Sequence, residues 1–120
     1  MTEHRPGLDP ERLAERSSDE RFEADLRVPQ HLDVWPGHFP GYFVVPGVLQ
    51  VDWVVRAAAE RFGTKAPSAI ENLKFKAPLK PSQTFTLYLE RSDHGIEFRL
   101  AQGESVFASG RLEFGVGARA

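Results

Sequence analysis

A histidine and an aspartate stand 14 positions apart in a stretch of the chain that is rich in proline and glycine. Residues 36–55 read PGHFPGYFVVPGVLQVDWVV and contain both His38 and Asp52. A histidine is largely neutral near pH 7 and can accept a proton, whereas a carboxyl group held in an apolar wall can donate one. The pair therefore has the residue types that general acid–base catalysis requires.

Two Pro-Gly pairs, at 36–37 and 40–41, bracket His38. Proline fixes its own φ and glycine permits backbone conformations that other residues avoid, so we expect a stiff loop that holds His38 in one place. A lone histidine in a loop more often has no function, and this alternative stays open for His38. The remaining histidines are interpreted as having no catalytic role: His4, His31 and His94.

A helix is expected from Pro46 to about Phe62, closed by Gly63. Val45 occupies the position where Ser, Thr, Asp or Asn would normally cap the helix, so the N–H groups of Gly47 and Val48 lack an obvious side-chain acceptor. A ligand carbonyl or oxyanion could bind there with the help of the helix dipole. Water or a neighbouring carbonyl would satisfy the same donors equally well.

Asp52 falls at the margin of the apolar face that the helical period predicts. That face consists of Val48, Val51, Val54, Val55, Ala58, Ala59 and Phe62. Leu49, Trp53 and Ala57 fall among the polar positions on the other side. One interpretation is an exposed Asp52–Arg56 pair at i,i+4 spacing. The other is a carboxyl in an apolar wall, where desolvation favours the protonated acid.

The composition excludes several classes of protein. The 120 residues suit one domain, and 15 Lys and Arg against 17 Asp and Glu argue against nucleic-acid binding and membrane attraction. The absence of cysteine excludes disulfides, thiolate metal sites and a Cys nucleophile. No apolar run approaches the length of a membrane span, so we expect a cytoplasmic, soluble protein.

Residues 1–20 are rich in charged residues, and we expect a mobile N-terminal arm with a turn or two of helix over DPERLAER. Alternation of apolar and polar residues then predicts strands on either side of the helix. These are residues 22–28, 69–76, 84–90, 96–100 and 106–114. The resulting order, β-α-β-β-β-β, is an α+β fold with an antiparallel sheet wrapped around one long helix.

The segments GHFPG and PGVLQVD resemble the active-site segment of the hot-dog-fold 3-hydroxyacyl-acyl-carrier-protein dehydratases. The short chain and PGVLQVDW are most similar to the small aryl-polyene-type thioester dehydratases. The resemblance implies a hot-dog domain over residues 21–117 and a homodimer in which His38 of one subunit faces Asp52 of the other. It also implies that the N–H of Gly47 holds the thioester carbonyl, with Val48 beside it. The positions implied to shape the loop and the tunnel are Phe39, Pro40, Gly41 and Pro46.

The implied reaction removes water from a 3-hydroxyacyl thioester, in fatty acid or polyene biosynthesis, to give the trans-2-enoyl thioester. His38 is the implied base at C2, and Asp52 protonates or orients the departing hydroxyl. No metal or organic cofactor is implied, because the acyl group arrives on the phosphopantetheine arm of an acyl carrier protein. Candidate contacts with that acidic partner are Lys74, Lys76, Lys80 and Arg61.

Two other functions fit the same fold. In a hot-dog thioesterase, Asp52 would activate water against the thioester carbonyl. A non-catalytic hot-dog module would only bind acyl chains or a partner. Residues 42–45 also depart from the family pattern of a basic or small residue, a proline and two apolar residues, which leaves the acyl chain length open.

Overall fold

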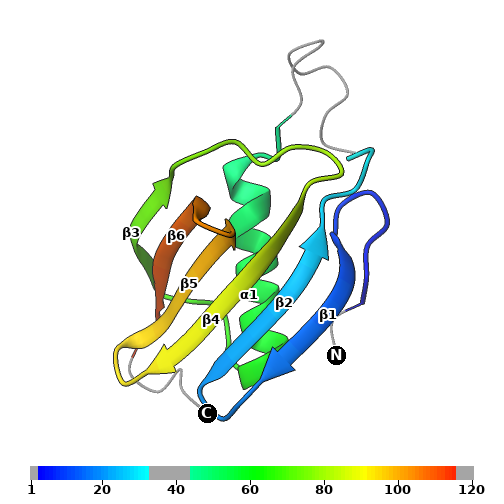
Figure 1. The fold of residues 1–120 in the computed structure, drawn as a ribbon. Helices are drawn as coiled ribbons and strands as arrows, with labels where there is room; N and C mark the ends of the chain where they lie inside the picture. The colour runs from blue at the N-terminus through cyan, green and yellow to red at the C-terminus, as the bar shows by residue number, and fades with distance from the viewer. Residues whose placement is uncertain (1–2, 33–43, 116–120) are drawn as a thin grey trace.

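The structure is a computed structural model, and it describes residues 3–32 and 44–115. In the described chain a single helix interrupts a series of strands (Figure 1). The elements are β1 (Glu11–Ser17), β2 (Arg21–Arg27), α1 (Gly47–Phe62), β3 (Ala69–Phe75), β4 (Thr84–Ser92), β5 (Gly95–Gln102) and β6 (Ser105–Glu113).

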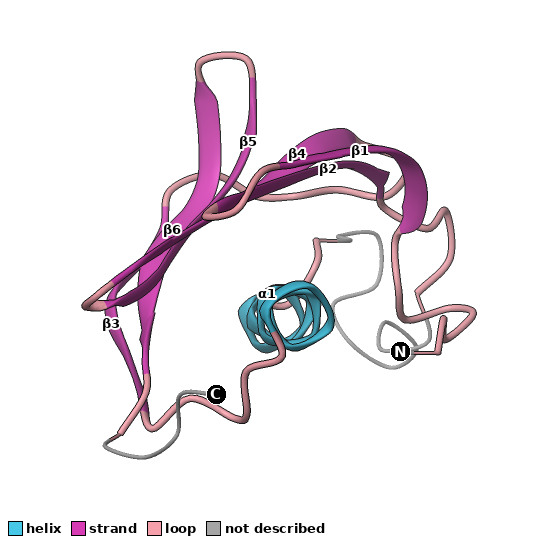
Figure 2. Cartoon of the chain, turned by 90° about the horizontal axis from the view of Figure 1, so that it is seen from below, coloured by secondary structure: helices cyan, strands magenta, loops and turns pink. Residues whose placement is uncertain are grey.

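The strands form one antiparallel sheet in the order β1-β2-β4-β5-β6-β3. Seen along its axis, α1 lies inside the curve of this sheet, and the N-terminal segment lies on the side of the helix that the sheet leaves open (Figure 2). The predicted α+β arrangement of an antiparallel sheet around one long helix is therefore present. β1 and β3 are the two edge strands.

The expectation of an arm without strands over residues 1–20 is wrong for residues 11–17, which form β1 and pair with β2. All seven residues of β1 are exposed, so the strand lacks the alternating burial that predicts a strand from sequence. It is held by backbone pairing and by charge: Arg16 bonds Glu23 at 3.1 Å and Asp25 at 3.0 Å on the neighbouring strand. The sheet consequently begins eleven residues earlier than expected.

Three strands show the alternating burial that the sequence predicts. β2, β4 and β5 alternate buried and less buried residues, and their buried side chains face α1. Trp53 of α1 stacks on Phe85 of β4 with ring centroids 5.9 Å apart, which fixes the helix against the sheet. β6 completes the core with Phe107, Ala108 and Leu112.

The buried face of α1 differs from the predicted one. Leu49, Trp53 and Ala57, which the period placed among the polar positions, are buried with Val54 and Ala58. Val48, in contrast, is 80 % exposed. The sheet curls around only one side of the helix, so the valine side remains partly uncovered, and periodicity does not distinguish which apolar side meets the sheet.

The ends of α1 agree with the sequence prediction within one residue. The helix begins at Gly47, with Pro46 in an extended conformation before it, and it ends at Gly63 in the left-handed region at φ 70°. The Gly63 N–H donates to the carbonyl of Ala59 at 2.9 Å. Among the residues that the structure describes, no helix has the length and apolar character needed to cross a bilayer.

Candidate active site at the start of the central helix

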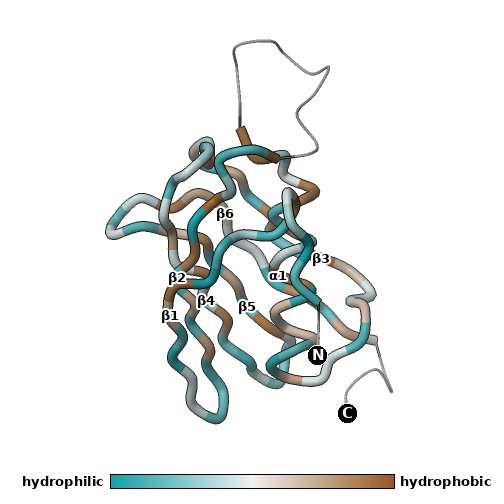
Figure 3. The backbone as a smooth tube through the Cα atoms, turned by 90° about the vertical axis from the view of Figure 1, so that its right-hand side faces the viewer, coloured by the Kyte–Doolittle hydropathy of each residue, from teal (hydrophilic) through white to brown (hydrophobic). Residues whose placement is uncertain are grey.

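The backbone is tightly held where it enters α1. The Val45 N–H donates to the Leu79 carbonyl at 2.7 Å, and the Gln50 amide donates to the Val45 carbonyl at 3.1 Å. Val44 and Val45 lead into the helix, and the hydropathy colouring shows short hydrophobic stretches of backbone among hydrophilic ones (Figure 3). These contacts fix the direction in which the first helical N–H groups point.

Those N–H groups have the open arrangement that the sequence predicts. Leu49 and Gln50 donate to the Pro46 carbonyl at 3.1 and 3.2 Å. Within the described residues, no side chain caps the helix, and no acceptor is recorded for the N–H of Gly47 or of Val48. Two adjacent donors at the positive end of a helix dipole are suited to a carbonyl oxygen or an oxyanion.

A shallow groove of about 410 Å³ lies at this helix end. It is lined by Val44, Val45, Gly47, Gln50, Phe75, Lys76, Ala77 and Pro78. The Oε1 atom of Gln50 is buried with no hydrogen-bond partner in the described part of the chain, and the residue is only 4 % exposed. The groove thus combines an apolar wall from Phe75 with polar groups from the helix start.

The absence of a side chain at Gly47 leaves room for a neighbouring ring as well as for a ligand. A β-carbon at this position would lie 2.7 Å from the Cζ atom of Phe75, closer than any side chain tolerates without displacement. The ring of Phe75 on β3 therefore lies directly against the helix start. Glycine at this position lets the ring lie against the helix start without being displaced.

Asp52 lies in the second turn of α1, five residues after Gly47. On an ideal helix this places the two residues about 7.5 Å apart along the axis and about 140° apart around it. The Asp52 side chain is 41 % exposed and forms an ion pair with Arg5 of the N-terminal segment. The expected alternative partner, Arg56, is not the partner of Asp52 in the described structure.

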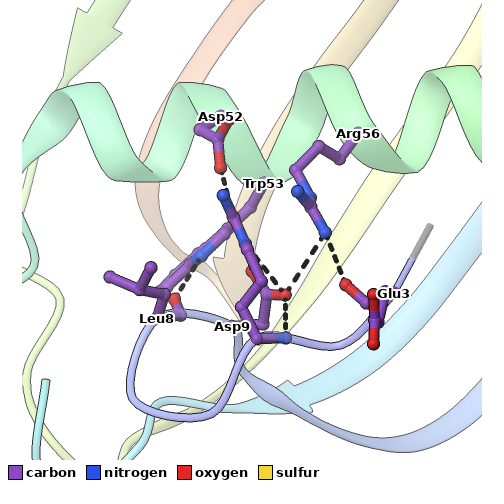
Figure 4. A network of polar contacts seen from close by, with 7 residues as sticks. Glu3, Leu8, Asp9, Asp52, Trp53 and Arg56 are labelled. Carbon is purple, nitrogen blue, oxygen red and sulfur yellow. Dashed lines mark hydrogen bonds and ion pairs between the residues drawn. The ribbon is translucent and has the colours of Figure 1, made fainter. Parts of the chain in front are cut away.

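Arg56 instead binds the N-terminal segment (Figure 4). Its guanidinium donates to the Glu3 carbonyl at 2.7 Å and lies 3.5 Å from the Asp9 carboxylate. Trp53, next to Asp52, donates from its indole N–H to the Leu8 carbonyl at 2.8 Å. The segment before β1 is thereby bound along the same side of α1 that carries Asp52.

Asp9 is the central acceptor of this network. Its side chain is only 11 % exposed, and it receives bonds from the Arg5 guanidinium at 2.7 Å and from the Arg5 backbone N–H at 2.7 Å. Burial alone raises the pKa of Asp9, but the bonds from Arg5 and the nearby charge of Arg56 outweigh it and lower the pKa below its ordinary value. The hydrogen bonds that Arg5 donates to Asp9, and then the one that it donates to Asp52, raise the pKa of Arg5.

The residues expected in the loop, His38, Phe39, Pro40 and Gly41, lie outside the described residues. Pro46, Gly47, Val48 and Asp52 all fall within the first two turns of α1 or immediately before them. The helix-borne candidates therefore share one end of α1, with Gly47 and Asp52 on different sides of it.

The four basic residues expected to meet a carrier protein do not share one surface. Lys76 lines the groove at the helix start, and Lys74 and Lys80 are exposed nearby in sequence. Arg61 lies in the last turn of α1, about 21 Å along the helix from Gly47. It donates to the Ser18 carbonyl at 2.9 Å, which gives it a structural contact of its own.

Sequence reasoning missed two contributions to this site. Phe75 belongs to a strand expected only as part of the sheet, and its contact with Gly47 depends on how β3 lies across the helix start. Arg5 and Asp9 lie in the segment expected to be mobile. The only sequence signal for this pair was its i,i+4 spacing. In the structure the two residues lie in a turn, in which the Leu8 and Asp9 N–H groups donate to the Arg5 carbonyl.

The chain matches a family model along most of its length. The model is that of the ApeI-like proteins, described as ApeI dehydratase, and it matches residues 14–111. The match includes the groove and both helix-borne candidate groups, Gly47 and Asp52.

Curated relatives are 3-hydroxyacyl-acyl-carrier-protein dehydratases. The chain is 37 % identical to the 3-hydroxyacyl-acyl-carrier-protein dehydratase FabZ of Oenococcus oeni, over 68 % of this chain and 65 % of the relative. It is 32 % identical to the FabZ of Levilactobacillus brevis, over 94 % of this chain and 85 % of the relative. The chain thus spans just under two thirds of the length of the first of these relatives.

A solved structure shares the fold. A chain of the dehydratase heterocomplex ApeI:P from Xenorhabdus doucetiae superposes with a TM-score of 0.80 and 27 % identity, covering 88 % of this chain and 97 % of that one. The hot-dog fold predicted from the sequence is confirmed by this match.

Proposed function

Because the chain belongs to the ApeI-like dehydratase family of hot-dog proteins, we propose that it removes water from a 3-hydroxyacyl thioester to give the trans-2-enoyl thioester. The observation that carries the proposal is the uncapped start of α1, where the N–H groups of Gly47 and Val48 have no side-chain cap and Gly47 lines a groove, about one and a half turns before Asp52. These are the two groups that the elimination needs on the enzyme besides a base.

The thioester carbonyl oxygen binds the N–H groups of Gly47 and Val48. Removal of the C2 proton places negative charge on this oxygen, and preorganised N–H donors at a helix N-terminus stabilise that charge more than they stabilise the ground state. The glycine matters here because a side chain at position 47 would also meet Phe75.

His38 removes the C2 proton, and Asp52 protonates or orients the hydroxyl that leaves C3. A positioned acid or base of this kind contributes about 10² to 10⁴ in rate. The steps require no metal ion and no organic cofactor. The substrate is carried on the phosphopantetheine of an acyl carrier protein, and Lys76 at the edge of the groove is suited to meet that acidic partner.

We also propose that two copies of the chain associate through β3 and the uncovered side of α1. Three of the four exposed large apolar side chains in the described residues lie there: Val48, Leu73 and Phe75. β3 is an edge strand and offers unpaired backbone groups to a second copy. In such a dimer, His38 of one subunit reaches Asp52 of the other.

One assay tests the function. The purified chain is given a 3-hydroxyacyl thioester, and absorbance of the enoyl product and release of free thiol are followed together. A dehydratase produces the enoyl signal without thiol. Thiol release without enoyl product would identify a thioesterase, and neither signal would indicate a binding module; both results would overturn the proposal.

A further inference from the structure

We propose that Arg5 is a positioning residue for Asp52, so that the N-terminal segment, residues 3–10, completes the reaction site. This inference rests on the proposed function, because it assigns a role to the group that holds the candidate acid. It concerns a residue outside the motif that carries the family resemblance.

The Arg5 guanidinium is itself held in place. Its Nε lies 3.1 Å from Oδ1 of Asp9, and its Nη2 lies 2.7 Å from the same oxygen. The Arg5 backbone N–H also donates to Asp9, at 2.7 Å. A planar guanidinium fixed in this way loses little further freedom when its Nη2 binds Oδ2 of Asp52.

The segment that carries Arg5 is also bound to α1 at Trp53 and Arg56, which both follow Asp52 in the helix. Leu8 accepts from Trp53, and Glu3 accepts from Arg56. Figure 4 shows these contacts along one side of the helix, with Asp52 at one end and Arg56 at the other. The segment also forms one wall of a cavity of about 330 Å³, opposite the core residues Phe22, Trp53 and Leu87.

The ion pair fixes the direction of the Asp52 carboxyl group, because its Oδ2 is held by Nη2 of Arg5. A carboxyl group held in one direction keeps the geometry that protonating or orienting the 3-hydroxyl requires. Arg5 therefore acts through Asp52 and does not touch the reacting atoms.

The contact is tested by kinetics of Arg5→Ala against Arg12→Ala. Arg12 is a matched control, because it also pairs with a carboxylate of α1, Glu60 at 3.3 Å, two turns beyond Asp52. We expect Arg5→Ala to lower kcat by about 10- to 100-fold with KM within about threefold of wild type, as for a misplaced catalytic group. Arg12→Ala should retain wild-type kinetics.

A second measurement separates positioning from general structural support. In an Asp52→Asn background, Arg5→Ala should cause no further loss, because the group through which Arg5 acts has been removed. Equal losses in both backgrounds would overturn the proposal, as would wild-type kinetics or increased activity for Arg5→Ala. If circular dichroism shows that the Arg5→Ala variant is not folded, the same two comparisons are made with Arg5→Gln.

The outcome also distinguishes this inference from the proposed function. If the wild-type chain forms no enoyl thioester, the proposed function fails, and the role of Arg5 fails with it. If the wild type forms enoyl thioester and Arg5→Ala does so at the same rate, only the role of Arg5 fails.

Discussion

The ring of Phe75 lies against Gly47, so that a β-carbon on Gly47 would lie 2.7 Å from the Cζ of the ring. This contact joins an edge strand of the sheet to the helix N-terminus at which the substrate oxygen is proposed to bind. The ring is 49 % exposed and can swing outward, whereas the helix backbone cannot move without breaking the Val45–Leu79 bond.

Gly47→Ala should therefore reduce activity more than stability. We expect the ring of Phe75 to be displaced into the groove and kcat/KM to fall by about 10- to 100-fold, less than the roughly 10² to 10³ that complete loss of a donor to the oxyanion costs. The melting temperature should fall by only a few degrees, roughly the effect of 1 kcal/mol in a domain of this size. The measurements are enoyl formation and thermal unfolding, with Gly103→Ala as a control for glycine replacement away from the groove.

The control distinguishes two kinds of effect. Gly103 has φ 57° and no atom within 4 Å of an added β-carbon, so its replacement strains the backbone without touching the groove. It should lower stability and leave kcat/KM unchanged. A Gly47→Ala enzyme with wild-type kcat/KM would contradict the assignment of the oxyanion site.

The stability that Asp9 contributes should depend on pH. Its pKa is lowered in the folded chain, so its contribution is present above the ordinary carboxyl pKa and is lost as the pH falls through the lower, folded value. Asp9→Asn should reduce the free energy of unfolding by about 1 to 3 kcal/mol at pH 7, since charged hydrogen bonds are lost. The difference from wild type should shrink below about pH 4. Denaturant unfolding at pH 7 and at about pH 2.5, well below the ordinary carboxyl pKa, measures it; a difference that is independent of pH would mean that the charge of Asp9 does not stabilise the fold.

Self-association should depend on the β3 edge and not on the β1 edge. Leu73 on β3 and Leu13 on β1 are exposed to similar extents, 40 % and 43 %, at opposite edges of the sheet. Leu73→Asp should shift the chain from dimer to monomer in light scattering, because a charge is desolvated at the proposed interface. Leu13→Asp should leave the dimer intact. If Leu13→Asp dissociates the dimer and Leu73→Asp does not, the interface lies at the β1 edge, which would contradict the proposal.

Much of the fold could be predicted from the sequence, because a strand that is buried on one face alternates apolar and polar residues along the chain. This applies to β2, β4 and β5, and Gly63 marks the end of α1 for an equally local reason. β1 could not be predicted in this way. Its residues are exposed on both faces, and it is held by pairing with a strand that periodicity does not identify as its neighbour.

The site was predictable where its chemistry is local. The open N–H groups of Gly47 and Val48 follow from Pro46 and from the absence of a capping side chain. The ion pair of Asp52 was not predictable, because its partner Arg5 is 47 residues away and reaches it only after the N-terminal turn binds α1. The helical period favoured Arg56, which is nearer in sequence but is engaged by Glu3 and Asp9.

The central claim is that dehydration uses His38 of one subunit and Asp52 of the other, and a mixture of two inactive variants tests it most directly. His38→Ala and Asp52→Ala are each expected to be folded and to lose about 10² to 10⁴ in rate, because each removes a group that acts at the reacting atoms. Equal amounts are refolded together, and native mass spectrometry establishes that heterodimers have formed. Half of the dimers are then mixed and each mixed dimer has one intact site, so enoyl formation should return to about a quarter of the wild-type rate. No recovery in a mixture that contains heterodimers would contradict the shared site.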